Sequence, residues 1–255
     1  MTAEYAPPRA GASAVLLLFS AGRRADAEAV AQLLASQPGA ARHFAISHRP
    51  PAEEGWLELL ITGLAFDLVG LAPAAALPTP AVRHRFGVAG PDPEAPLEAV
   101  VLRPGAHLAG GENLLPVVRA MMQLAVDLAG LGGVEAVIWA PAATMMGRDY
   151  FLRNVGRWLE GGAFPALGLT ALLREADGAI CSDGLAFFTG QELRIEPTSQ
   201  NGAGGDGKIA IRLIHSLVSG GDISPPCLVD GPEGEVLRIE PARSGGLWRV
   251  WRAAG

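Results

Sequence analysis

The sequence predicts an α+β fold, with mixed, largely antiparallel sheets and helices packed on them, from three observations. Hydrophobic residues make up 49% of the 255 residues, which is enough to bury a sizeable core. The 33 glycines and 20 prolines indicate frequent turns. Strand and helix patterns come in runs with hairpin signals, unlike the regular alternation of a doubly wound parallel sheet. Two strand–helix–strand halves are expected, and the sequence leaves open whether they form one domain.

The first half is expected over residues 12–71, after a small, Pro-rich and poorly ordered N-terminus at residues 1–11. A buried strand, SAVLLLFS, precedes a helix over about 26–36. A short strand, RHFAISH, follows. The stretch WLELLITGLAFDLVGL then predicts a hairpin whose two strands meet at Gly63.

Residues 72–96 contain six prolines, each of which lacks a backbone N–H donor. A central strand is therefore excluded there, and at most one edge strand is expected, near His84. This Pro-rich connector is the predicted boundary between the two halves.

The second half is expected over residues 97–255. It opens with the strand LEAVVLR, followed by an apolar helix over about 114–128, the strand EAVIWA and the helix DYFLRNVGRWLEGG. The stretches PALGLTALLRE and SDGLAFFTGQELRIEP predict two or three strands. A glycine-rich loop leads to the helix KIAIRLIHSLVSG, and strands near CLV, EVLRIEP and LWRVW finish the chain.

Composition argues against several classes of partner. The net charge is −6 and no dense stripe of Lys and Arg is present, so nucleic acid is not expected. Charged residues and Pro73 interrupt the longest apolar run, so no membrane span is predicted. Cys181 and Cys227 lie far apart and outside any CxxC spacing, which favours a reduced cytoplasmic protein.

The segment GAGGDGKI, residues 202–209, matches the spacing of a phosphate-binding loop. Ile209 stands where a Ser or Thr hydroxyl would hold Mg²⁺, and the preceding strand LRIEP alternates charged residues. The match is therefore interpreted as a glycine loop before a helix, and no cofactor is predicted.

Few residues point to chemistry. His107 and Glu112 lie in GAHLAGGEN, a glycine-rich entry to a helix, where an anion could bind. A loop with Glu112 placed favourably against the helix dipole is the preferred interpretation. The five histidines show no metal-ligand spacing, and no GxSxG motif is present, so neither a metal site nor a nucleophile is predicted.

The stretch SDGLAFFTGQELRIEP is interpreted as sheet architecture. Strand alternation puts Leu193 and Ile195 on one face and a charged row on the other, namely Glu192, Arg194 and Glu196. That row suits a solvated face, so Glu192→Gln is expected to change stability by no more than about 0.5 kcal/mol. Gly184 and Gly190 are expected at turns or bulges that redirect the strand.

The second half resembles a bacterial family of domains of unknown function with an alanine-rich helix, a Trp strand and a GL-x-x-F-x-G-x-E core. The resemblance covers about residues 97–240. The residues that fit it are Trp139, Phe151, Pro165, Gly184, Leu185, Gly190 and Glu192. It implies a cytoplasmic bacterial α+β protein and no particular activity.

Two functions are weighed. The first is a non-catalytic binding or interaction module that recognises another protein. The alternative is an enzyme or small-molecule sensor with a cleft between the two halves. Its polar lining would be His107, Glu112, Asp183 and Glu192. The oligomeric state stays open.

Overall fold

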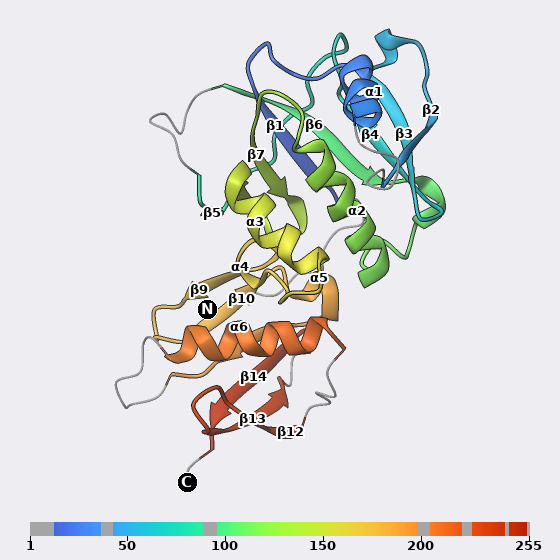
Figure 1. The fold of residues 1–255 in the computed structure, drawn as a ribbon. Helices are drawn as coiled ribbons and strands as arrows, with labels where there is room; N and C mark the ends of the chain where they lie inside the picture. The colour runs from blue at the N-terminus through green and yellow to red at the C-terminus, as the bar shows by residue number, and fades with distance from the viewer. Residues whose placement is uncertain are drawn as a thin grey trace. The chain divides into compact units, whose positions relative to one another are not determined.

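The structure is a computed structural model that describes residues 13–36, 43–88, 96–197, 205–220, 226–242 and 245–253. It confirms the α+β class, with two largely antiparallel sheets (Figure 1). The described residues divide after Gly162 into an N-terminal unit, residues 13–162, and a C-terminal unit, residues 163–253. The predicted N-terminal tail, residues 1–11, lies outside the described residues.

The described part of the N-terminal unit holds a sheet in the order β2-β3-β4-β6-β1-β7-β8-β5. Its strands are β1 (Val15–Ser20), β2 (Ala45–His48), β3 (Trp56–Ile61), β4 (Leu64–Val69), β5 (His84–Phe86), β6 (Leu97–Pro104), β7 (Val134–Trp139) and β8 (Thr144–Gly147). Neighbours run antiparallel except β5 and β8. Strand β1 is thus central, which explains why nearly all of it is buried.

The predicted hairpin is confirmed at β3 and β4. Ile61 pairs with Leu64, so the loop has two residues. Both of them, Thr62 and Gly63, have positive φ values, 49° and 83°. Two such residues are what a tight turn of type I′ requires, and its twist matches that of the flanking strands.

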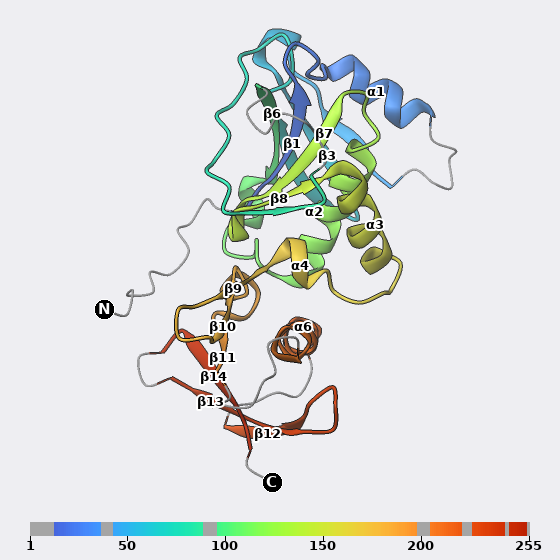
Figure 2. The same ribbon diagram turned by 90° about the vertical axis from the view of Figure 1, so that its left-hand side faces the viewer.

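Helices α1 (Ala27–Ser36), α2 (Leu115–Leu128) and α3 (Arg148–Leu159) lie to one side of this sheet (Figure 2). Asp26 caps α1 by accepting the N–H of Ala29 at 2.7 Å. Helix α2 packs on β1, β4 and β6, and α3 packs on β7, β8 and α2. Short 3₁₀ turns occupy Ala52–Glu54, Ala106–Leu108 and Ala140–Ala142.

The Pro-rich connector does not separate two domains. Strand β4 before it pairs with β6 after it, in one sheet. Leu77 bridges to Ala99, and Val82 packs on a buried cluster on the face opposite the helices. That cluster is Leu16, Leu18, Ala99, Ala136, Ile138 and Met145. Within residues 72–88 no central strand forms, and β5 is the edge strand expected near His84, but apolar residues between the prolines there cover the sheet; residues 89–95 of the connector lie outside the described residues.

The C-terminal unit holds a second sheet in the order β12-β13-β14-β11-β10-β9. Its strands are β9 (Ala171–Arg174), β10 (Ile180–Asp183), β11 (Glu192–Ile195), β12 (Cys227–Asp230), β13 (Val236–Pro241) and β14 (Leu247–Arg252). Neighbours run antiparallel except β11 and β14. The helical elements are α4 (Ala166–Leu169), α5 (Ala186–Thr189) and α6 (Gly205–Val218).

Helix α6 lies against one face of this second sheet (Figure 2). The buried side chains of Leu193 and Ile195 belong to that face, as predicted. An ion pair of 2.7 Å between Asp206 of α6 and Arg252 of β14 anchors the helix there. The opposite face carries Arg194 and its neighbours, and it forms the candidate site.

Candidate functional site

Glu192 is held by four hydrogen bonds, which the sequence did not predict. Its carboxylate accepts the backbone N–H of Gly184 at 2.9 Å, of Ala186 at 3.1 Å and of Leu185 at 3.2 Å. It also accepts the hydroxyl of Ser182, which in turn accepts the N–H of Leu193 at 2.7 Å. Successive N–H groups that converge in this way form a nest for an anion.

The local backbone explains why the Glu192 carboxylate is bound by the chain itself although the residue is only half-buried. The residues after Gly184 do not continue as a strand but turn into the short helical element α5. Gly184 and Gly190 bracket that turn with φ values of 92° and 77°. The N–H groups at the start of α5 would lack partners, and the Glu192 carboxylate supplies the acceptors. The interpretation of Glu192 as a solvated sheet residue is therefore wrong.

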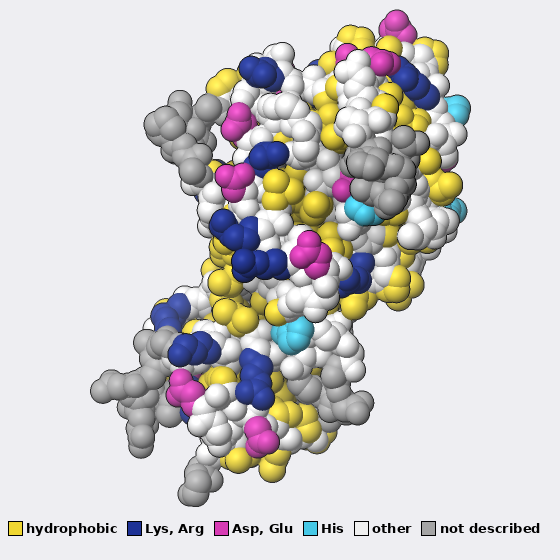
Figure 3. All heavy atoms as spheres, viewed as in Figure 1, with side chains coloured by type: hydrophobic (Ala, Val, Ile, Leu, Met, Phe, Trp, Pro, Cys, Tyr) yellow, Lys and Arg dark blue, Asp and Glu magenta, His cyan; other side chains and the backbone are white. Residues whose placement is uncertain are grey.

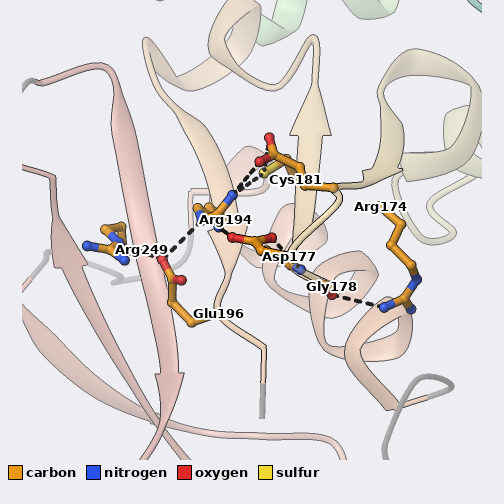
Figure 4. Close-up of polar contacts among 9 residues, drawn as sticks. Arg174, Asp177, Gly178, Cys181, Arg194, Glu196 and Arg249 are labelled. Atoms are coloured by element: carbon orange, nitrogen blue, oxygen red, sulfur yellow. Dashed lines mark hydrogen bonds and ion pairs between the residues drawn. The ribbon is translucent and has the colours of Figure 1, made fainter. Parts of the chain in front are cut away.

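Arg194 forms the centre of an ion-pair network on the same face (Figure 4). Its guanidinium binds Glu175 at 2.8 Å, Glu196 at 3.2 Å and Asp177. Its side chain is only 15% exposed. Glu196 also accepts the Nε–H of Arg249 at 2.5 Å, so the network joins the β9–β10 turn to β11 and β14.

The network shifts several pKa values. Burial acts to lower the pKa of Arg194, but the hydrogen bonds, first of all to Glu175, outweigh it and the pKa is raised. The N–H of Ala179 and the Arg194 guanidinium lower the pKa of Asp177. Burial, helped by Glu175, raises the pKa of the Cys181 thiol to about 11. Cys181 is therefore a protonated thiol near neutral pH and a poor nucleophile.

Beyond this network, on β12, β13 and β14, the same face carries arginine, tryptophan and exposed aliphatic side chains. The guanidinium of Arg238 lies 4.9 Å from the centre of the Trp251 ring, and that of Arg249 lies 5.0 Å from it. Leu228 pairs with Arg238 across the strands and is 65% exposed. Val236, two residues before Arg238, is exposed as well. We call these five residues the Arg–Trp face.

The four predicted cleft residues fall into two pairs. His107 and Glu112 belong to the N-terminal unit, and Asp183 and Glu192 belong to the C-terminal unit. His107 accepts the N–H of Ala65 at 3.4 Å, and Glu112 accepts the N–H of Gly110 at 2.9 Å. Both side chains thus bind backbone N–H groups of their own unit, Glu112 within its own loop and His107 across to β4. Asp183 lies at the end of β10, half-buried.

A second polar cluster, which the sequence analysis did not predict, joins His43 to α2. The Nδ1 atom of His43 lies 3.1 Å from an oxygen of Asp127 and 3.2 Å from Nε2 of Gln123. Burial raises the pKa of Asp127, while His43 acts to lower it. No hydroxyl or thiol contacts His43 within the described ranges, so the pair lacks a nucleophile to activate. A spacing of 84 residues leaves no pattern in the sequence that could have shown it.

Two other sequence features have structural roles. Gly207 and Lys208 of the segment GAGGDGKI lie within α6. The exposed Nζ of Lys208 is 3.9 Å from a carboxylate oxygen of Glu233. Residues 202–204 lie outside the described residues. His215, also in α6, accepts the N–H of Phe164 at 3.1 Å.

Neither a metal centre nor a membrane helix is found in the part of the chain that the structure describes. No three His, Cys, Asp or Glu side chains there gather as metal ligands. None of the helices in those ranges has the length and apolar character needed to span a bilayer.

Comparisons with known proteins identify no family for this chain. No protein-family model, no curated protein and no solved structure matches the chain. The resemblance drawn from Trp139 to Glu192 therefore stays a prediction, and the function has to be argued from the site alone.

Proposed function

We propose that this protein is a non-catalytic interaction module and that the Arg–Trp face is its binding surface for another protein. The observation that carries the proposal is the 65% exposure of Leu228 beside Arg238, which together with Arg249 is stacked on Trp251. Tryptophan and arginine are enriched at protein interfaces and often dominate their binding energy. On a sheet face without a partner, alternating polar residues would be expected in place of exposed aliphatic ones.

The polar residues of the C-terminal unit support binding over catalysis. A catalytic carboxylate needs a free oxygen aimed at a substrate, whereas both oxygens of Glu192 are engaged by the chain's own N–H and O–H groups. Arg194 is likewise engaged by three carboxylates. The Cys181 thiol is protonated at neutral pH, because its pKa is raised to about 11. The bonds of Glu192 and Arg194 instead hold together the part of the sheet beside the Arg–Trp face.

The proposal takes the protein to be cytoplasmic and its partner to be a protein. Cys181 and Cys227 are both free thiols, in keeping with a reducing compartment. Nucleic acid is disfavoured by the net charge of −6. Basic and acidic side chains are also interspersed on the α6 side of the C-terminal unit, where Figure 3 shows no continuous basic patch.

Site-specific photo-crosslinking tests the proposal. A benzoylphenylalanine at position 228 is expected to give one discrete adduct with a second protein in a bacterial lysate. The matched control places the same group at Ile211, an exposed aliphatic residue of α6 in the same unit. Val236→Asp, a change at an exposed position, should abolish the adduct from position 228. Equal adducts from both positions, or none from position 228, would contradict the proposal.

A further inference from the structure

We infer that the partner presents an extended acidic segment with two carboxylates at positions i and i+2, which Arg238 and Arg249 bind. This inference rests on the proposed function and names the chemistry of its partner. It depends on the orientation of the two guanidinium groups, on their spacing and on the aliphatic residues beside them.

Both arginines contact a glutamate of their own chain through Nε. Arg249 donates its Nε–H to Glu196 at 2.5 Å, and the Nε of Arg238 lies 3.5 Å from Glu240. For the two terminal nitrogens of either residue, the described residues provide no hydrogen-bond partner. Those terminal nitrogens form the fork that binds a carboxylate through two parallel bonds. Arg249 is 43% exposed and Arg238 is 52% exposed, so both forks are accessible.

Stacking on Trp251 orients both forks before a ligand arrives. A long arginine side chain loses much rotational freedom when it binds, which weakens most exposed ion pairs. Here the contacts of 4.9 Å and 5.0 Å with the Trp251 ring, together with the Nε contacts, restrict both side chains in advance. Restriction in the free protein lowers the entropy cost of binding.

The spacing of the two arginines matches an extended peptide. Arg238 pairs directly with Trp251 on the neighbouring strand, and Arg249 lies two residues before Trp251. Diagonal neighbours of this kind lie about 7–8 Å apart. In an extended chain, side chains at i and i+2 point to one side and lie about 6.6–6.8 Å apart. Two carboxylates spaced in this way can therefore engage both forks at once.

The residues around the arginines define the remainder of the segment. Leu228 and Val236 adjoin Arg238 on the side away from Arg249, so an aliphatic residue two positions beyond the second carboxylate, on the same side of the extended segment, would cover them. A nucleic-acid strand fits less well, because the Trp251 ring on which a base would stack already holds two guanidinium groups. Two carboxylates repel an anion here and limit the affinity, namely Glu240, which is 39% exposed, and the exposed Asp230, which pairs with Val236.

Fluorescence anisotropy with a labelled peptide, Gly-Ser-Glu-Val-Glu-Val-Leu-Ser, tests the inference on the full chain. Saturable binding is expected, with Kd about tenfold weaker in Arg238→Gln and in Arg249→Gln. Lys208→Gln, which removes an exposed cation from α6, should change Kd by less than about twofold. Glu240→Gln should tighten binding, because it removes one repelling carboxylate, while Arg238 loses only a contact of 3.5 Å and stays oriented by the Trp251 ring. Circular dichroism of each variant verifies that the fold is kept.

Two further probes, a rearranged peptide and a single-stranded oligothymidine, test which kind of ligand the Arg–Trp face prefers. A peptide of the same composition with adjacent carboxylates, Gly-Ser-Glu-Glu-Val-Val-Leu-Ser, should bind several-fold more weakly, since neighbouring side chains point to opposite sides. Equal binding of both peptides, no effect of the two arginine variants, or tighter binding of a single-stranded oligothymidine would overturn the inference.

Failure of the inference can be told apart from failure of the proposed function. If position 228 crosslinks to a partner while the acidic peptide does not bind, the interaction surface stands and the acidic segment is refuted. If neither experiment gives a signal, both fall.

Discussion

Replacing Glu192 by Gln tests the nest at the start of α5 most directly. The substitution keeps the size of the side chain and removes its charge, and it turns one acceptor oxygen into an NH₂ donor. Each oxygen of Glu192 accepts two bonds, one pair from Gly184 and Ala186 and the other from Ser182 and Leu185. Whichever oxygen is replaced, two donors lose their acceptor.

The expected loss of stability is about 3 kcal/mol. A hydrogen bond to a charged group contributes about 1.5–3 kcal/mol, and the lower end applies here because Glu192 is only half-buried. Two such bonds give about 3 kcal/mol. The matched control is Glu240→Gln, which removes one carboxylate on the same face with a single contact at 3.5 Å. Its effect should stay within about 0.5 kcal/mol.

Urea unfolding followed by circular dichroism measures the loss, and hydrogen exchange locates it. The amides of Gly184, Leu185 and Ala186 should exchange faster in Glu192→Gln than in Glu240→Gln, because they lose the acceptor that protects them. If the two variants have equal stability and equal exchange at these amides, the nest contributes nothing and the reasoning fails.

The Cys181 thiol, the Arg194 ion pairs and two glycines give three further predictions. Burial raises the pKa of the Cys181 thiol to about 11, so the stability that the protonated thiol contributes is lost as the pH rises from the ordinary thiol range toward 11. Cys181→Ser should therefore reduce the loss of unfolding free energy at alkaline pH. A backbone N–H and Arg194 lower the pKa of Asp177, whose contribution is lost as pH falls through that lowered value. Arg194→Gln should bring this pKa closer to its ordinary value in an NMR titration, and an unchanged value would refute the ion pair. Gly147→Ala should cost roughly 2 kcal/mol or more, because its Cβ would lie 2.0 Å from a carbonyl oxygen, whereas Gly156→Ala, in open space within α3, should gain about 0.5–1 kcal/mol. Thermal unfolding of this pair gives the signs, and a loss at both positions would contradict the packing described.

Local patterns predicted most of the secondary structure. The hairpin at Gly63 and the placement of Leu193 and Ile195 on one buried face depend on residues close in sequence, and both were predicted. The region from Gly184 to Gly190 was not, because an aromatic pair between two glycines suits a bulged strand as well as a helical turn. The choice depends on Glu192, which lies beyond the turn and supplies its acceptors.

The division of the chain was not predictable for a different reason. Prolines in residues 72–96 indicate where strands cannot form, but they do not reveal whether the segment packs on a sheet. The candidate site shows the same limit, since the cation–π contacts of Trp251 depend on the register of β13 and β14. Such contacts join residues 238 and 251 through pairings that a single sequence does not display.

The central position of β1 has a consequence for synthesis on the ribosome. Val15 pairs with Leu102 and with Trp139, so β1 is synthesised well before either of its neighbours, β6 and β7. At about 5–20 residues per second, the roughly 120 residues that separate β1 from the end of β7 take on the order of ten seconds to translate. Until β6 emerges the segment VLLLFS has no neighbour to pair with, and until β7 emerges one of its edges stays open, so its apolar residues are exposed to chaperones that bind extended hydrophobic segments.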